Sequence, residues 1–87
     1  MNKSFKIPEN ITFESIDKNV YILNVENGEY FKLSESASFI WNYIENGLSS
    51  EEIIINLKSL FDENDAIDDD VEETLNNFVE RGFIAEN

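Results

Sequence analysis

The stretch VYILNVENGEYFKL, residues 20–33, decides the fold of this 87-residue chain. Its first six residues favour β-strands, and Asn27-Gly28 follows them closely. Because Asn-Gly between two β-rich runs is the strongest short signal for a hairpin, residues 29–33 are predicted to form the returning strand. The run before this hairpin, residues 11–16, is also rich in strand-forming residues. The three runs together predict a small three-stranded antiparallel sheet.

The returning strand has two different faces. Glu29, Phe31 and Leu33 alternate with Tyr30 and Lys32, so the two sets point to opposite sides of the sheet. We expect Phe31 and Leu33 to lie in the core. If this strand is an edge of the sheet, its unpaired backbone groups can bind an added peptide strand. The alternative is that the edge is only exposed to solvent.

Two helices are predicted directly after the sheet. Residues 35–46 carry apolar side chains at helical spacing, with Ser34 as the N-cap and Gly47 just past the end. An S-x-x-E capping box at residues 49–52 opens a second helix over residues 50–61. The buried stripe of this second helix is predicted to consist of Ile53, Ile54, Leu57, Leu60 and Phe61.

A third helix is predicted over residues 69–81, after a polar loop at residues 62–68. Asp69 and Glu72 form a box-like start, and acids in the first turns suit the helix dipole. Phe83-Ile84 is expected to pack back on the core. The predicted apolar face of this helix consists of Val71, Leu75, Phe78 and Val79, and a second stripe beside it consists of Asp70, Thr74, Asn77 and Arg81.

The composition excludes several kinds of chemistry. The chain has 19 acids, 6 bases, no His and no Cys, for a net charge of −13. Without these residues it has no thiol nucleophile, imidazole base, disulfide or ordinary zinc site, so we expect no enzyme activity, no metal and no cofactor. No apolar run is long enough to span a membrane, and the start does not read as a signal peptide. We therefore expect a cytoplasmic protein of one domain, residues 1–87, with a core at about 11–86.

The charge is concentrated in the second part of the chain. Residues 51–87 hold twelve acids and two bases, which gives −10. A winged helix-turn-helix arrangement suggests a DNA-binding regulator, which we keep as the alternative function. Nucleic acid and anionic membranes are nevertheless poor partners, because proteins bind phosphates through Lys and Arg.

The acidic segment at residues 62–73 resembles a calcium-binding loop at first sight. A loop of the EF-hand type needs an oxygen ligand at position 5 and Gly at position 6. Here Ala66 and Ile67 occupy those positions. We therefore interpret this segment as a solvated loop whose acids cap the third helix.

Four stretches carry a family resemblance: NGEYFKLS (27–34), SFIWNYIENG (38–47), LSSEEI (48–53) and DVEETLNNFVERGFI (70–84). Their order resembles the PqqD-like family of RiPP recognition elements, over about residues 19–86. The resemblance implies an α+β fold of the winged helix-turn-helix type, with a three-stranded antiparallel sheet followed by three helices.

The resemblance also implies a function. Members of the family bind the leader of a ribosomally synthesised precursor peptide and present it to a modifying enzyme, such as a radical SAM enzyme, a leader protease or a cyclase. The leader lies antiparallel along the third strand and is clasped by the third helix. The matching positions here are Glu29, Tyr30, Phe31, Lys32, Leu33, Val71, Thr74, Leu75, Asn77, Phe78 and Arg81.

The matching residues are expected to have different roles in binding the leader. The backbone of residues 30–32 would pair with the leader. Leu75 and Phe78 would line the base of the groove and receive apolar anchors, and Lys32 and Arg81 would be available to an acidic leader residue.

Overall fold

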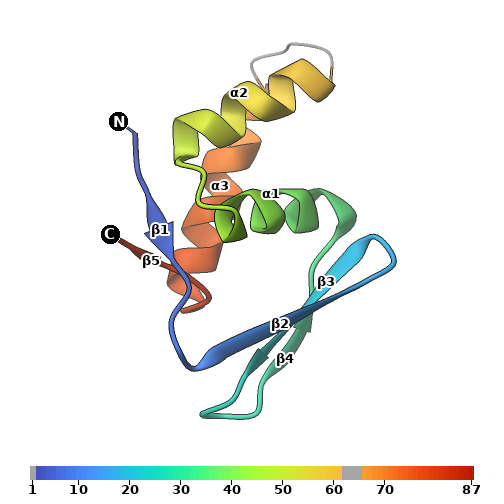
Figure 1. Cartoon of the computed structure of the whole chain (residues 1–87), viewed down its shortest axis with the longest axis vertical. Coiled ribbons are helices and arrows are strands. Elements are labelled where there is room, and N and C mark those ends of the chain that lie inside the picture. The colour runs from blue at the N-terminus through green and yellow to red at the C-terminus, as the bar shows by residue number, and fades with distance from the viewer. Residues whose placement is uncertain (1, 62–65) are drawn as a thin grey trace.

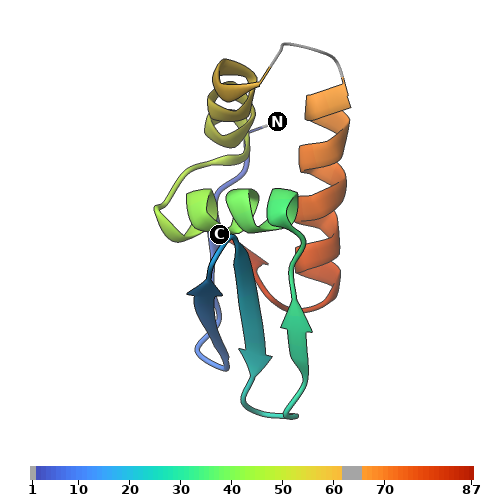
Figure 2. The same ribbon diagram turned by 90° about the vertical axis from the view of Figure 1, so that its right-hand side faces the viewer.

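The chain forms an α+β fold in which a small antiparallel sheet lies below three helices (Figures 1 and 2). The computed structural model describes residues 2–61 and 66–87. The predicted order of sheet first and helices second is confirmed. In chain order the elements are β1 (Phe5–Lys6), β2 (Ile11–Ile16), β3 (Asn19–Asn24), β4 (Tyr30–Lys32), α1 (Glu35–Glu45), α2 (Ser50–Leu60), α3 (Ala66–Glu80) and β5 (Ala85–Glu86).

The main sheet has the strand order β2-β3-β4, and both neighbouring pairs are antiparallel. The predicted hairpin joins β3 to β4. Gly28 adopts a φ of 74°, a left-handed conformation that suits glycine, and its N–H donates to the Asn24 carbonyl at 2.8 Å. Asn27 braces the same turn, because its side-chain oxygen accepts the Glu29 N–H at 2.9 Å. The three predicted strands are therefore present and in the expected order.

A second, two-stranded sheet was not predicted. β1 pairs with β5 in antiparallel fashion, with Phe5 opposite Glu86. The pairing brings the two ends of the chain side by side at one flank of the helices (Figure 1). Each strand has only two residues, which is too short for a periodic pattern to be visible in the sequence.

The caps of the first two helices are as predicted. The Ser34 hydroxyl accepts the Ala37 N–H at 3.2 Å at the start of α1. At the start of α2, the Ser49 hydroxyl accepts the Glu52 N–H, and the Glu52 carboxylate accepts the Ser49 N–H at 2.9 Å. These bonds to Ser49 hold the pKa of the Glu52 carboxyl below its usual value, mainly through the backbone N–H.

The predicted start of the third helix is wrong. Ala66 is already helical, so Asp69 lies inside α3 and is not its cap. The reason is that half-buried Ile67 packs against the core and extends the apolar stripe of the helix by one turn. Residues 66–73 of the calcium-loop comparison are therefore helix, and residues 62–65 of it lie outside the described residues.

The core joins the sheet to all three helices. Trp41 of α1 is fully buried, and its ring makes edge-on contacts with Phe13 at 5.4 Å and Phe78 at 5.6 Å between centroids. Phe83 and Ile84 are each 2% exposed, which confirms that the C-terminal tail packs back on the core.

Three predicted core positions are wrong. Leu60 and Phe61 are 60% and 53% exposed, because the last turn of α2 lies at the top of the molecule, away from the sheet (Figure 1). Val79 of α3 is 40% exposed, since the stripe of Val71, Leu75 and Phe78 already fills the face that meets the core.

Candidate functional site

The outer strand β4 has a free edge. The Leu33 N–H donates to the Val20 carbonyl of β3 at 2.8 Å. In an antiparallel pair, residues whose backbone N–H and C=O groups face the neighbouring strand alternate with residues whose groups face away from it. Phe31 and Leu33 therefore direct their backbone groups toward β3. The N–H and C=O groups of Tyr30 and Lys32 therefore point away from the sheet. These four groups can pair with an added strand.

The end of this strand is tied to the start of α1. The hydroxyl of Ser38, which is 2% exposed, accepts the Val20 N–H at 2.8 Å and donates to the Ser34 carbonyl at 2.8 Å. The side-chain amide of Asn19 donates to the Leu33 carbonyl at 2.8 Å. These bonds fix the position at which the free edge of β4 meets the helices.

The side chains of β4 divide between two environments. On the inner face, Leu33 is buried and half-buried Phe31 packs against the core. On the outer face, Tyr30 is 60% exposed and stacks on Tyr21 with ring centroids 5.8 Å apart. The Lys32 ammonium lies 6.0 Å from the centroid of the same Tyr21 ring. The strand thus keeps its backbone edge accessible while its inner face is anchored.

Arg81, at the end of α3, approaches β4 from the inner side. Its guanidinium carbon lies 5.3 Å from the centroid of the Phe31 ring. Lys32 lies on the opposite face of the sheet, over Tyr21. The two predicted cations therefore flank the strand from opposite sides and do not form a single cationic cluster.

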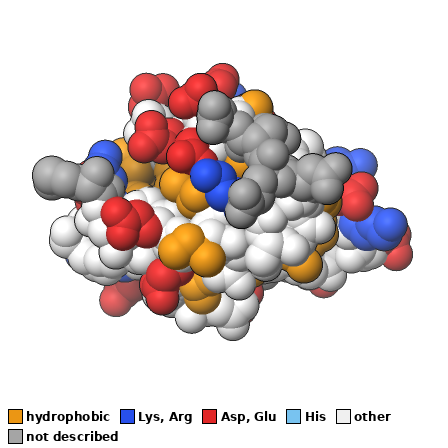
Figure 3. All heavy atoms as spheres, turned by 90° about the horizontal axis from the view of Figure 1, so that it is seen from above, with side chains coloured by type: hydrophobic (Ala, Val, Ile, Leu, Met, Phe, Trp, Pro, Cys, Tyr) orange, Lys and Arg blue, Asp and Glu red, His pale blue; other side chains and the backbone are white. Residues whose placement is uncertain are grey.

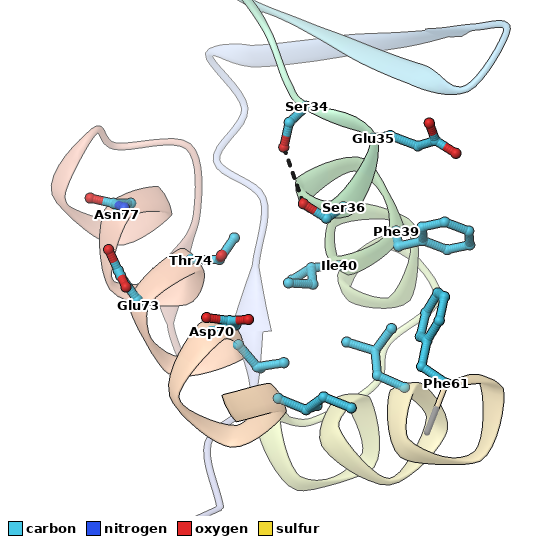
Figure 4. Close-up of a pocket in the computed structure, with 13 residues that line it drawn as sticks. Ser34, Glu35, Ser36, Phe39, Ile40, Phe61, Asp70, Glu73, Thr74 and Asn77 are labelled. Atoms are coloured by element: carbon cyan, nitrogen blue, oxygen red, sulfur yellow. Dashed lines mark hydrogen bonds between the residues drawn. The ribbon is translucent and has the colours of Figure 1, made fainter. Parts of the chain in front are cut away.

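Beyond the end of β4, the three helices enclose an open pocket of about 920 Å³ (Figure 4). Its lining includes the buried apolar residues Ile40, Leu57 and Val71, and α1 and α3 lie on opposite sides of it. Phe39 and Phe61 meet edge-on at its far side, with ring centroids 6.1 Å apart. The lining residues are Ser34, Glu35, Ser36, Phe39, Ile40, Leu57, Phe61, Ile67, Asp70, Val71, Glu73, Thr74 and Asn77.

The predicted site residues of α3 fall into two groups. Thr74, Asn77 and Val71 line the pocket. Leu75 and Phe78 are only 4% and 3% exposed, and they pack in the core beneath the helix. Neither residue lines the pocket, and the expectation that they receive apolar anchors of the leader stays a prediction.

Three of the six residues that line the pocket on α3 belong to the second stripe noted in the sequence. Asp70, Thr74 and Asn77 recur at helical spacing and share one side of α3. Sequence reasoning missed the contributions of α1 and α2, such as Phe39 and Phe61. Both were visible only as apolar residues at helix positions, which is also the signal of a core residue.

The charged residues that line the pocket, among those the structure describes, are all acidic. Glu35, Asp70 and Glu73 belong to its lining, and no Lys or Arg of the described residues does. Glu35 has a partner in Lys18 at 3.9 Å, but both side chains are largely exposed, so the pair is weak. Figure 3, which looks down on the molecule, shows several acidic side chains and a basic one beside exposed hydrophobic ones.

Two other kinds of site are absent from residues 2–61 and 66–87. This part of the chain holds no group of three or more acidic residues arranged to bind a metal ion. No helix within it is long and apolar enough to cross a membrane.

Residues 19–84 match the protein family described as Coenzyme PQQ synthesis protein D (PqqD). The chain belongs to this family. The match covers β3, β4 and all three helices, so the matched region of this chain includes both the free edge and the pocket. The resemblance inferred from the sequence motifs is thereby confirmed.

Two solved structures share the PqqD fold of this chain. One is of TbiB1 in complex with the TbiA(beta) leader peptide, with 25% identity and a TM-score of 0.85, and the alignment covers 91% of this chain and 93% of that one. The other is of lasso peptide synthetase B1 complexed with the leader peptide, with 20% identity and a TM-score of 0.85, covering 94% and 98%. No curated protein matches the chain at a significant level.

Proposed function

We propose that this chain binds the leader of a ribosomally synthesised precursor peptide by strand addition. One observation carries the proposal: the free edge of β4 leads directly into the pocket whose far wall is α3. An edge supplies main-chain hydrogen bonds, and an adjoining pocket supplies side-chain selectivity. The similar structures of TbiB1 and lasso peptide synthetase B1, both solved with leader peptides, support this interpretation.

The leader strand would run antiparallel to β4. Its backbone would pair with the outward N–H and C=O groups of Tyr30 and Lys32, between Glu29 at one end and Leu33 at the other. Past Leu33, the leader would enter the pocket beside Thr74 and Asn77. Leu75, Phe78 and the Phe31–Arg81 contact would hold α3 and β4 in place from within.

The chain would contribute binding and no bond chemistry. It has no His or Cys, and the acids of the described residues are exposed, apart from half-buried Asp68, rather than gathered in an enclosed site. By holding the precursor, it would raise the effective concentration of the peptide at a modifying enzyme in the cytoplasm, such as a radical SAM enzyme, a leader protease or a cyclase.

Titration with candidate leaders tests this function. Short reading frames beside the gene would be identified, and the N-terminal segment of each would be synthesised with a fluorescent label. We expect one segment to bind with micromolar or tighter affinity in fluorescence anisotropy. The control is a labelled DNA duplex at moderate salt, which we expect not to bind. Binding of the duplex and of no leader would contradict the proposal and favour the DNA-binding alternative.

A further inference from the structure

We infer that the pocket between α1, α2 and α3 selects a leader segment in which Lys or Arg adjoins a large apolar residue, N-terminal to the strand-pairing segment. This inference rests on the proposed function, and it adds the chemistry of the peptide that the site prefers. Three features support it: the direction of β4, the apolar surface of the pocket and the sign of its charges.

The direction of β4 sets which part of the peptide reaches the pocket. The strand runs from Tyr30 toward Leu33, and Ser34 then begins the lining of the pocket. A peptide that runs antiparallel to β4 therefore has its N-terminal side at Ser34. Residues that precede its strand-pairing segment would enter the space between α1 and α3 (Figure 2).

The pocket offers apolar surface that the chain itself leaves uncovered. Phe39 and Phe61 are 40% and 53% exposed, although their rings are in contact with each other. Ile40 and Leu57, which are buried, also belong to the lining. Exposed apolar surface inside a concave site is typical of a binding region, so a large aliphatic or aromatic side chain would gain free energy by covering it.

The charges of the pocket favour a cation beside that apolar side chain. Asp70 and Glu73 come from α3, whereas Glu35, in the first turn of α1, points its carboxylate away from α3 (Figure 4). A Lys or Arg in the pocket would be attracted to the acids of α3, whereas an acidic residue there would meet like charge. Thr74 and Asn77 add neutral hydrogen-bonding groups to the same wall of the pocket.

A display selection tests this inference even when the precursor has not been identified. A library of random peptides, each of about 20 residues, would be prepared by mRNA display and selected for binding to the immobilised chain. The selection would be repeated on Asp70→Asn/Glu73→Gln, which neutralises the pocket. The matched control is Asp69→Asn/Glu72→Gln, which removes the same charge from neighbouring exposed positions of α3 that do not line the pocket. Glu35→Gln, on α1, provides a second pocket variant.

We expect Lys or Arg next to a large apolar residue to be enriched at least about threefold by the original chain and by the control. The enrichment should fall toward the library frequency with Asp70→Asn/Glu73→Gln and decrease with Glu35→Gln, while peptides are still recovered. Circular dichroism would verify that each variant is folded.

Two other outcomes separate this inference from the proposed function. Recovered peptides that show no basic excess, or the same excess on the neutralised pocket, would overturn the inference and leave peptide binding intact. Recovery of no peptide by the original chain and by the control would count against the proposed function and, with it, against the inference.

Discussion

The two outer strands of the main sheet, β2 and β4, both have a free edge, yet we propose that only β4 binds a peptide. On β2, the Val25 N–H donates to the Asn10 carbonyl at 2.8 Å, so the alternation directs the N–H groups of Phe13 and Ser15 outward. β2 lies on the side of the sheet away from α3 (Figure 2). β4 instead leads into a pocket walled by α3. On this proposal, the unpaired backbone groups of an edge strand bind a peptide only where a second wall, here α3, lies beside them.

The largest effect on leader binding is expected when one outward N–H is removed from the β4 edge, and the same change on the β2 edge is its control. Lys32→Pro deletes a donor of the β4 edge and sets a proline ring against the incoming strand. We expect a loss of about 2 kcal/mol in leader binding, or about thirtyfold in Kd, measured by fluorescence anisotropy.

The matched control for this change is Ser15→Pro, which deletes an outward N–H of the β2 edge at an exposed position. We expect it to leave leader binding unchanged. Phe31→Pro is not a suitable test, because the Phe31 N–H faces β3 and its loss would disrupt the sheet itself. Equal binding by the original chain and by Lys32→Pro would be incompatible with strand addition at β4.

A smaller effect is expected from the bonds that hold β4 against α1. Ser38→Ala removes the hydroxyl that accepts the Val20 N–H and leaves this buried donor without that bond. We expect the free energy of unfolding to fall by about 1.5 kcal/mol, measured by urea denaturation. Ser36→Ala, an exposed change two residues earlier, should have little effect. If both changes had the same effect, the Ser38 bonds would not be what fixes the end of β4.

The smallest effect is expected at a residue that touches neither edge. The folded-state pKa of Glu52 is lowered by hydrogen bonds from Ser49. Its carboxylate therefore stabilises the fold above the ordinary pKa of 4.5, and this stabilisation is lost as the pH falls through the lower folded value. Thermal melts of Glu52→Gln should show a small loss of stability at pH 7 that shrinks in acid, with leader binding at pH 7 unchanged. A difference that grows in acid would contradict this direction of the pKa shift.

Local signals in the sequence predicted most of the fold. Asn27-Gly28 identified the hairpin, and Ser49 with Glu52 identified the start of α2, because turns and caps depend on residues that are close in the chain. The β1–β5 pair could not be predicted, because residues some 80 positions apart meet there through two-residue strands. The start of α3 was predicted too late because Asp69 resembles a cap.

The candidate site was predicted less completely than the fold. The edge at residues 30–32 follows from strand order and alternation, so the sequence could indicate it. The pocket depends on how α1, α2 and α3 pack together, and no sequence spacing reports that Phe39 meets Phe61. For the same reason, periodicity alone could not separate core residues such as Leu75 from pocket residues such as Thr74 on α3.

The central claim is that a peptide pairs with the outward backbone groups of β4 and not with those of β2. Amide hydrogen exchange on the ¹⁵N-labelled chain, followed by NMR with and without a saturating leader segment, measures this directly. The account predicts that exchange at Tyr30 and Lys32 slows at least about tenfold while exchange at Phe13 and Ser15 is unchanged. Slowed exchange at Phe13 and Ser15, or no change at Tyr30 and Lys32 while the leader is bound, would contradict it.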